Sequence, residues 1–188
     1  CSAVSTAFCS ASATTIFAGA GSGASNTFAG TISAEGALTN NAAGVLNYQG
    51  AVVGSASLLK IGTSTLTLGG TNTYGGATTI ANGTLALGPS GSISNTPSID
   101  IAAGKLLDVS QVTGGWTLYD HQTLSGAASV AGNVTALGTI RPGASPGTLV
   151  FSNDLALSSA GLEMELSDVG AVGGGTNDLI DVKGNLAL

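Results

Sequence analysis

Charged side chains are scarce in this chain of 188 residues. Asp, Glu, Lys and Arg together make up 7% of it, whereas an ordinary globular domain carries about 25%. The cations are spread along the chain without a cluster, at Lys60, Lys105, Arg141 and Lys183. Nucleic-acid binding needs several Lys or Arg near successive phosphates, so this composition excludes it. The net charge of −6 also disfavours adsorption to an anionic membrane surface.

Helix-forming residues are equally rare. The chain contains three Glu, three Lys, three Gln and one Arg, but 30 Gly. Because glycine costs about 1 kcal/mol relative to alanine inside a helix, a helical fold would be penalised repeatedly. No apolar run approaches the roughly 18 residues that span a bilayer as a helix, so we expect no direct membrane insertion. Mean hydropathy is +0.42, which is too apolar for a disordered chain.

The chain does contain many short runs of Thr, Val, Ile and Leu, each cut by Gly or Asn. Such runs favour strands, so the sequence is predicted to be all-β. The clearest stretch covers residues 58–88 and reads LLKIGTSTLTLGGTNTYGGATTIANGTLALG. Its strands Thr65–Leu68 and Thr84–Leu87 begin 19 positions apart (84 − 65). A short strand that recurs at this spacing, with Gly and Asn at the corners, is typical of a β-solenoid.

Two other β architectures fit less well. Hairpin dipeptides are nearly absent, with Asn82-Gly83 as the exception, so a sandwich built from hairpins is disfavoured. No helical segment separates the strands, as βαβ crossovers would require. Parallel strands without crossover helices need a coiled chain, and we predict a right-handed parallel β-helix. At about 20 residues per turn it would have on the order of nine turns.

Two segments resemble a known family. Residues 58–88 closely resemble the passenger-associated repeat of autotransporters, the self-secreting surface proteins of Gram-negative bacteria. Residues 138–149 read GTIRPGASPGTL and are similar to a Pro-Gly corner in the same passengers. Proline fixes φ and removes a ladder donor, and we expect Gly143 and Gly147 to supply positive φ values, so that the segment forms a rigid corner.

The resemblance also indicates how the chain is organised. Residues 138–188 resemble the C-terminal stem turns of such passengers, whereas residues 1–57 are only weakly patterned. We therefore predict a single β-helical passenger fragment over residues 1–188, belonging to a larger protein. No signal peptide is visible, so the chain is interpreted as a mature or excised segment.

The resemblance implies a location and a role. Passengers of this family are exported across the outer membrane, which implies the bacterial cell surface or secretion. It further implies a non-enzymatic stalk or adhesin. Its expected partners are a host-cell surface protein or glycan, or identical rods in self-association. The alternative role is a secreted effector that binds a host receptor.

Cys1 and Cys9 are the only cysteines. In an exported protein the favoured interpretation is a small disulfide loop at the N-terminus. The alternatives are a free thiol at an excised end and a lipidated N-terminal cysteine. No His or further Cys completes a metal site with them, and no metal or cofactor is predicted.

Two patterns bear on catalysis. Residues 88–92, GPSGS, superficially resemble the nucleophile loop of chymotrypsin-like proteases. However, proline replaces that family's aspartate, and His121 follows the serine instead of preceding it, so a turn is predicted. Asp120 and His121 lack the further groups of a metal or acid–base site and are interpreted as a surface loop.

A polysaccharide lyase on a parallel β-helix is the remaining enzymatic alternative. Asp100, Asp108 and Asp120 would stack on one face only if the turns were about ten residues long. A period near 20 separates them instead, and a polyanionic sugar would need more cations than this chain carries. We therefore predict no enzymatic activity and no catalytic residues.

Two sets of side chains remain as ligand candidates. Glu163 and Glu165 alternate with apolar residues over Leu162–Leu166, so the period of two in a strand places both carboxylates on the outer face. With Asp168 they form a solvated acidic patch, or alternatively a weak calcium site.

Trp116 and Tyr119 are the candidate ligand contacts, because aromatic rings pack against sugars and protein surfaces. Trp116 follows two glycines and could occupy a loop tip. Packing in the core is the favoured alternative for this side chain.

Overall fold

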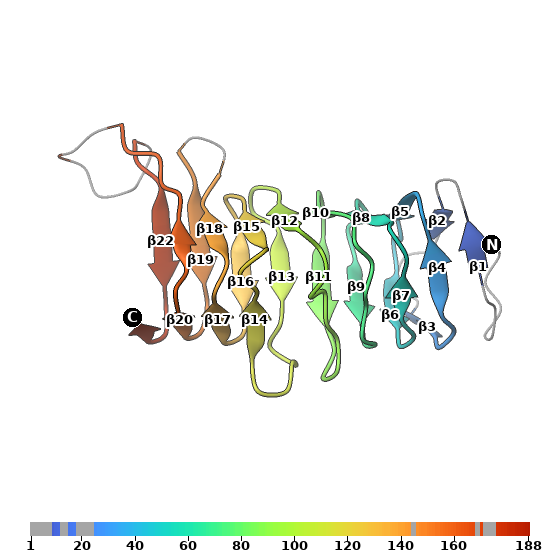
Figure 1. The fold of residues 1–188 in the computed structure, drawn as a ribbon. Helices are drawn as coiled ribbons and strands as arrows, with labels where there is room; N and C mark the ends of the chain where they lie inside the picture. Colours follow the sequence, from blue (N-terminus) through green and yellow to red (C-terminus); the bar gives the residue numbers. More distant parts are fainter. Residues whose placement is uncertain (1–8, 12–14, 18–24, 144–145, 168–169, 171–175) are drawn as a thin grey trace.

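The computed structural model describes residues 9–11, 15–17, 25–143, 146–167, 170 and 176–188. The described residues form strands and turns but no helix, and none of them belongs to a helix able to cross a membrane. The chain coils, and successive turns stack along one axis from the N-terminal to the C-terminal end (Figure 1). The all-β prediction is confirmed.

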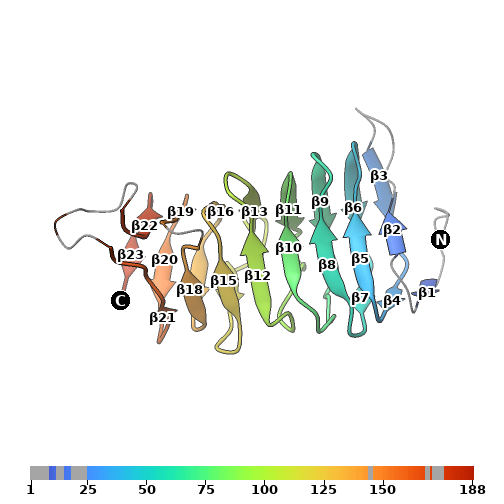
Figure 2. The same cartoon turned by 90° about the horizontal axis from the view of Figure 1, so that it is seen from above.

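Two sheets run along the whole rod on different sides of the coil (Figure 2). Sheet B contains β2 (Thr15–Phe17), β5 (Ala37–Asn40), β8 (Ser57–Lys60), β10 (Thr78–Ile80), β12 (Ser98–Ile101), β15 (Thr123–Ser125), β18 (Thr139–Arg141) and β21 (Gly161–Leu162). Sheet C contains β3 (Ser25–Phe28), β6 (Val45–Tyr48), β9 (Thr65–Leu68), β11 (Thr84–Leu87), β13 (Leu106–Asp108), β16 (Ser129–Ala131), β19 (Thr148–Phe151) and β22 (Leu179–Val182).

The third side of the coil is divided into two shorter sheets. Sheet A contains β1 (Cys9–Ala11), β4 (Ile32–Ala34) and β7 (Val52–Val53). Sheet D contains β14 (Trp116–Leu118), β17 (Val134–Ala136), β20 (Leu155–Leu157) and β23 (Leu186–Ala187). Between these two sheets, a single parallel bridge joins Thr71 and Ser92.

Every pairing between these strands is parallel, which confirms the β-solenoid. In the repeat, Leu58 pairs with Thr78 and Leu66 pairs with Leu85, close to the 19-residue spacing seen in the sequence. The solenoid has about seven turns instead of nine. Turn length varies along the rod, from 16 residues between Thr123 and Thr139 (139 − 123) to 31 residues between Phe151 and Val182 (182 − 151). The right-handed sense of the coil stays a prediction.

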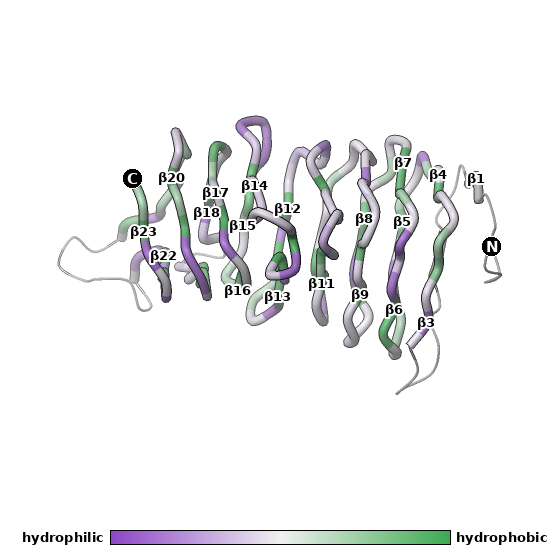
Figure 3. The backbone as a smooth tube through the Cα atoms, turned by 90° about the horizontal axis from the view of Figure 1, so that it is seen from below, coloured by the Kyte–Doolittle hydropathy of each residue, from purple (hydrophilic) through white to green (hydrophobic). Residues whose placement is uncertain are grey.

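The core is a set of inward rows, one residue from each strand. Alternation along each strand places every second residue inside, and hydrophobic and hydrophilic stretches follow one another along the coil (Figure 3). Burying a large aliphatic or aromatic side chain contributes about 1.5–3 kcal/mol, so the stack stabilises the rod turn by turn. The best-filled row of sheet C, at most 4% exposed, is Leu46, Leu66, Leu85, Leu107, Val130 and Phe151.

Polar residues of the repeat bind the turns to one another at the corners. The buried Asn72 accepts a hydrogen bond from Val52 N on the preceding turn (2.9 Å) and donates to Ser92 O on the following turn (3.0 Å). The hydroxyls of Tyr74 and Thr78 lie 2.6 Å apart. Because a buried polar group is costly unless it is paired, these bonds explain why the repeat carries asparagine, tyrosine and threonine at its corner.

Glycines at two corners show two different constraints. Asn82-Gly83 forms a coil corner between β10 and β11, with φ 67° at Gly83, and not a hairpin. Neither Gly143 nor Gly147 has a positive φ, so that prediction was wrong. At Gly147 the constraint is close approach, since a Cβ there would lie 1.9 Å from the carbonyl oxygen of Gly143.

Candidate binding surface

The outer side of sheet B carries two rows of polar side chains over β12, β15 and β18. Their positions follow from strand alternation and from the parallel register. Glu163 extends the second row, because its N–H donates to Ile140 O (3.0 Å) just beyond β21. We call this surface the polar face, and its residues are Ser98, Asp100, Thr123, Ser125, Thr139, Arg141 and Glu163.

Contacts within the polar face are few. Ser125 Oγ donates to Asp100 Oδ1 at 2.9 Å, and Arg141 Nε lies 3.8 Å from Glu163 Oε2. The last two side chains are 57% and 62% exposed, and such surface ion pairs contribute only about 0–1 kcal/mol. Their donors and acceptors are therefore available to a ligand at little energetic cost.

The corner at residues 119–122 borders the polar face, directly before β15. Buried Gln122 anchors it: its Oε1 accepts from Tyr119 N (3.0 Å), and its Nε2 donates to Ile93 O (2.9 Å) and Thr96 O (2.7 Å). The rings of Tyr119 and His121 stack with centroids 6.1 Å apart and planes 25° apart. A fixed backbone thus presents a stacked aromatic pair to solvent.

His121 joins this corner to the preceding turn. Its Nε2 lies 2.9 Å from Ser94 O, a contact that requires the proton on Nε2. Its Nδ1 lies 3.2 Å from Asp120 Oδ1. The side chains of Asp120 and His121 are both exposed, as expected for a surface loop.

The two aromatic candidates have different surroundings. Trp116 is 5% exposed and belongs to the core, in agreement with the packing interpretation, and little of its indole is accessible. Tyr119 is 41% exposed. Apart from its neighbour His121, it is the only exposed aromatic ring among the residues whose burial the structure describes. Ligand contact by either residue stays a prediction.

The acidic residues Asp100, Asp108 and Asp120 are separated, as a period near 20 predicted. Asp100 lies on sheet B, Asp108 on sheet C and Asp120 at the 119–122 corner. Among the residues that the structure describes, no group of three or more His, Cys, Asp or Glu is placed to hold a metal ion. Asp168 and Cys1 lie outside the described residues, as does the side chain of Cys9, so the Cys1–Cys9 disulfide stays a prediction.

The strand expected over Leu162–Leu166 is wrong beyond Leu162, where β21 ends. Glu163 and Glu165 are exposed as expected, but Leu162 (47%) and Leu166 (72%) are exposed too. The cause is a pair of buried side chains that the sequence did not reveal. Asp178 Oδ2 accepts from Glu165 N (2.8 Å) and its Oδ1 accepts from Gly147 N (2.7 Å), so the segment leaves the ladder.

Asn177 completes this arrangement. Its Oδ1 accepts from Ser167 N (2.7 Å), next to an antiparallel bridge with Leu166. Nothing in the local pattern of the sequence distinguishes these two polar residues from exposed loop residues.

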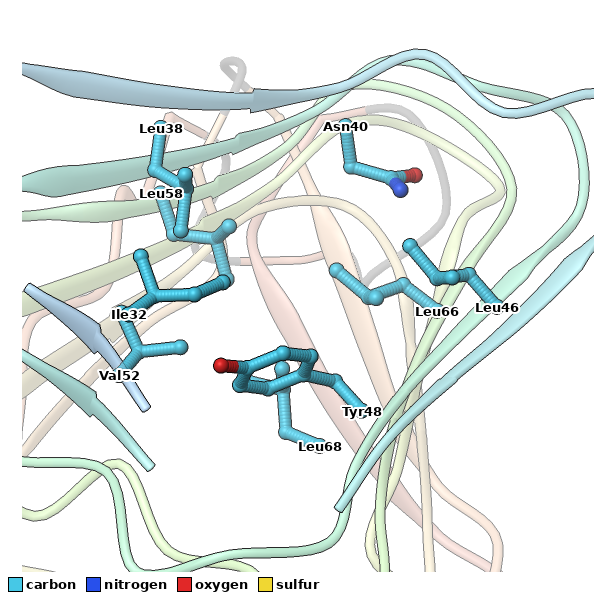
Figure 4. Close-up of a pocket in the computed structure, with 9 residues that line it drawn as sticks. All are labelled: Ile32, Leu38, Asn40, Leu46, Tyr48, Val52, Leu58, Leu66 and Leu68. Atoms are coloured by element: carbon cyan, nitrogen blue, oxygen red, sulfur yellow. The ribbon is translucent and has the colours of Figure 1, made fainter. Parts of the chain in front are cut away.

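The interior of the N-terminal turns contains a cavity of about 20 Å³ (Figure 4). It is walled by aliphatic side chains, and the amide of Asn40 points into the same interior with neither Nδ2 nor Oδ1 hydrogen-bonded. Because it lies inside the core, we interpret it as a packing defect. Its lining residues are Ile32, Leu38, Asn40, Leu46, Tyr48, Val52, Leu58, Leu66 and Leu68.

Lys60 occupies the next turn at the position of Asn40 and is fully buried. Its ammonium donates to Gly62 O and, at 3.3 Å, to Asn82 O. Burial lowers the pKa of Lys60 from 10.5 to about 8. In the sequence Lys60 is one of four dispersed cations, and no carboxylate pairs with it in the described part of the chain.

The architecture places the chain among the parallel β-solenoids. The family model of the passenger-associated-transport-repeat matches residues 58–87. The Adhesin BmaC autotransporter of Brucella suis biovar 1 (strain 1330) is 36% identical over 115 residues, which cover 57% of this chain and 3% of that protein. No solved structure gives a significant match.

These two matches support the assignment of the chain to an autotransporter passenger domain. The resemblance noted over residues 58–88 is confirmed. The chain spans only a small part of its relative's length.

Proposed function

We propose that this chain is an adhesive, non-enzymatic segment of an autotransporter passenger. Passenger similarity implies export to the cell surface or secretion. The observation that carries the proposal is the similarity to a protein named as an adhesin over 57% of this chain. The solenoid holds the polar face and the 119–122 corner in fixed positions, where they contact a host-cell surface protein or glycan, or an identical rod.

The physical basis is stiffness combined with an open surface. Each turn is bonded to its neighbours by parallel backbone ladders and by buried polar groups such as Asn72. In such stacks each turn contacts only the turns next to it. A change in one turn therefore has little effect on distant turns. Recognition therefore depends on outward side chains that need not rearrange on binding.

The test is binding of the soluble chain to host cells and to itself at matched concentrations. Saturable cell binding, or a concentration-dependent increase in sedimentation coefficient, supports adhesion. Soluble signalling activity on host cells without retention at their surface would instead indicate a secreted effector. Absence of both kinds of binding would assign the chain to a passive stalk.

A further inference from the structure

We propose that the polar face and the 119–122 corner together bind a neutral, linear glycan that lies along the axis of the solenoid. This inference rests on the adhesive function proposed above and specifies its ligand class. It concerns β12, β15, β18 and the residue that follows β21.

The first argument is the repeat distance. Adjacent parallel strands lie about 4.8 Å apart, close to the length of one sugar unit in an extended polysaccharide. Ser98, Thr123 and Thr139 are register partners on successive strands, so the face presents one hydroxyl per turn along the axis. A linear glycan in this direction would meet an equivalent group at each successive sugar.

The second argument is hydrogen-bonding chemistry. Sugar hydroxyls both donate and accept, and the polar face offers carboxylate acceptors at Asp100 and Glu163, guanidinium donors at Arg141 and hydroxyls of both kinds. Bonds to the charged groups are the stronger ones. Since their contacts with each other are solvent-exposed and weak, a ligand can replace them.

The third argument is the aromatic ring at the edge of the face. Tyr119 is exposed, and its backbone N–H is held by buried Gln122 while its ring stacks on His121. Binding sites for small organic ligands combine apolar aromatic surface with a few placed polar groups. The Tyr119 ring supplies the apolar surface for the C–H face of a sugar, and the strands supply the polar groups.

The fourth argument concerns charge. The face and its corner contain the carboxylates of Asp100, Asp120 and Glu163 but a single permanent cation, Arg141. A polyanionic glycan would be repelled, so a neutral one is expected. The described outward residues of sheets B and C themselves include no aromatic ring, so the exposed Tyr119 ring at the 119–122 corner is the aromatic feature of this face.

The experiment is a binding screen of the whole 188-residue chain. Its probes are neutral β-1,4-linked oligomers of glucose, mannose and N-acetylglucosamine, together with heparin and polygalacturonate as polyanions. Binding to at least one neutral oligomer and none to the polyanions is expected. Preference for a polyanion, or no glycan binding at all, would overturn the inference.

Variants locate the site. Tyr119→Ala should weaken binding of the neutral oligomer up to about tenfold, whereas Tyr119→Phe should retain it. The matched control is Thr39→Ala, on the same side of sheet B in the N-terminal turns, which should have no effect. Unaltered binding by Tyr119→Ala, with circular dichroism confirming that all variants fold, would contradict the proposed site.

A charge variant provides an independent readout. Asp100→Asn combined with Glu163→Gln should raise heparin binding, because it removes the two carboxylates that share a row with Arg141. Unchanged heparin binding would count against the electrostatic argument.

The failure of this inference can be separated from the failure of the adhesive function. Cell binding that survives periodate oxidation of cell-surface sugars would retain adhesion and overturn the glycan ligand. Binding to a neutral oligomer without any cell binding or self-association would retain the glycan site and contradict adhesion.

Discussion

Between β5 and β9 the interior of the solenoid contains a cavity, the unpaired amide of Asn40 and the buried ammonium of Lys60. From β11 to β19 the inner row of sheet C is instead filled by side chains that are 0% exposed. One inward column of sheet B shows the difference directly, since register places Asn40, Lys60, Ile80 and Ile101 on successive strands. The column changes from polar to apolar along the rod, while the backbone ladder continues unchanged.

This comparison shows that the solenoid tolerates an inward polar residue where its polar group reaches a hydrogen-bond partner at a corner. Lys60 reaches the carbonyl oxygens of Gly62 and Asn82, whereas the shorter Asn40 side chain has no hydrogen-bond partner. We therefore expect apolar packing to determine the stability of the central turns. In the N-terminal turns, we expect buried polar groups to lower it.

The outer surface differs between the same regions. Glu35 is the only acidic residue before Asp100, and the only cation in that half, Lys60, is buried. The polar face and the exposed Tyr119 ring lie on the later turns. We infer that the N-terminal turns act as a spacer and the later turns carry recognition.

The largest predicted effect concerns the packed central row. Leu107→Ala should lower the free energy of unfolding by about 3–5 kcal/mol, because a fully buried side chain is removed from a tight stack. Leu58→Ala beside the existing cavity should cost nearer 2 kcal/mol, since less packing is lost there. Urea unfolding followed by circular dichroism measures both, and equal costs would remove the proposed difference in packing.

The next effect concerns the buried cation. Lys60→Met should raise the free energy of unfolding at pH 7 by about 2 kcal/mol, because an unpaired buried charge is replaced by an apolar side chain of similar length. Lys105→Met is the control at a partly exposed lysine and should change stability little. A loss of stability in Lys60→Met would mean that its two carbonyl contacts outweigh the cost of burial.

The wild-type chain should become more stable as pH rises from about 8 to 10. The pKa of Lys60 is about 8 in the folded state and near 10.5 when unfolded, so the folded state releases this proton first. The free energy of unfolding should rise by about 2 kcal/mol over this pH range, since one pH unit between the two pKa values corresponds to about 1.36 kcal/mol. Burial raises the pKa of Tyr48 to about 12, so above pH 10 its ionisation in the unfolded state acts in the opposite direction.

Urea unfolding at intervals between pH 7 and 10 provides the measurement. In Lys60→Met this increase should disappear. If the variant kept the same pH profile as the wild type, another group would be responsible.

The smallest effect compares two inward polar side chains. Asn40→Leu should stabilise the chain by about 1 kcal/mol, because it removes an unpaired amide. Thr78→Val should destabilise it by about 1 kcal/mol, because the Thr78 hydroxyl is bonded to Tyr74 and Thr96. The thermal unfolding midpoints of the two variants should shift in opposite directions. Shifts of the same sign would contradict the difference between an unpaired and a paired inward side chain.

Several features were predictable because they depend on local pattern. The strands Thr65–Leu68 and Thr84–Leu87 pair in the register that their spacing indicates. The exposure of Asp120 and His121 also followed from local context. Such features require only strand alternation and a constant turn length.

Other features were not predictable because they depend on groups distant in the chain. Leu162–Leu166 has the alternation of a half-buried strand, yet it leaves the ladder because Asp178 accepts a hydrogen bond from Glu165 N and Asn177 accepts one from Ser167 N, just beyond the segment. Gly147 requires glycine because of the approach of Gly143 O, and not because of its own φ. The burial of Lys60 was missed because lysine is ordinarily an exposed residue.

The composition and the recurring Gly-bounded strands by themselves indicated that this chain coils into a parallel β-solenoid, since hairpin turns and crossover helices are both lacking and parallel strands then require a coiled chain. Only the tertiary structure decided which side chains meet. Asp100, Ser125 and Arg141 lie at unequal intervals in the sequence, and they form one row because loops of different length restore the same register on successive turns. Register is set by backbone pairing and by burial of the inward residues, so the outward neighbours follow from packing that no local pattern records.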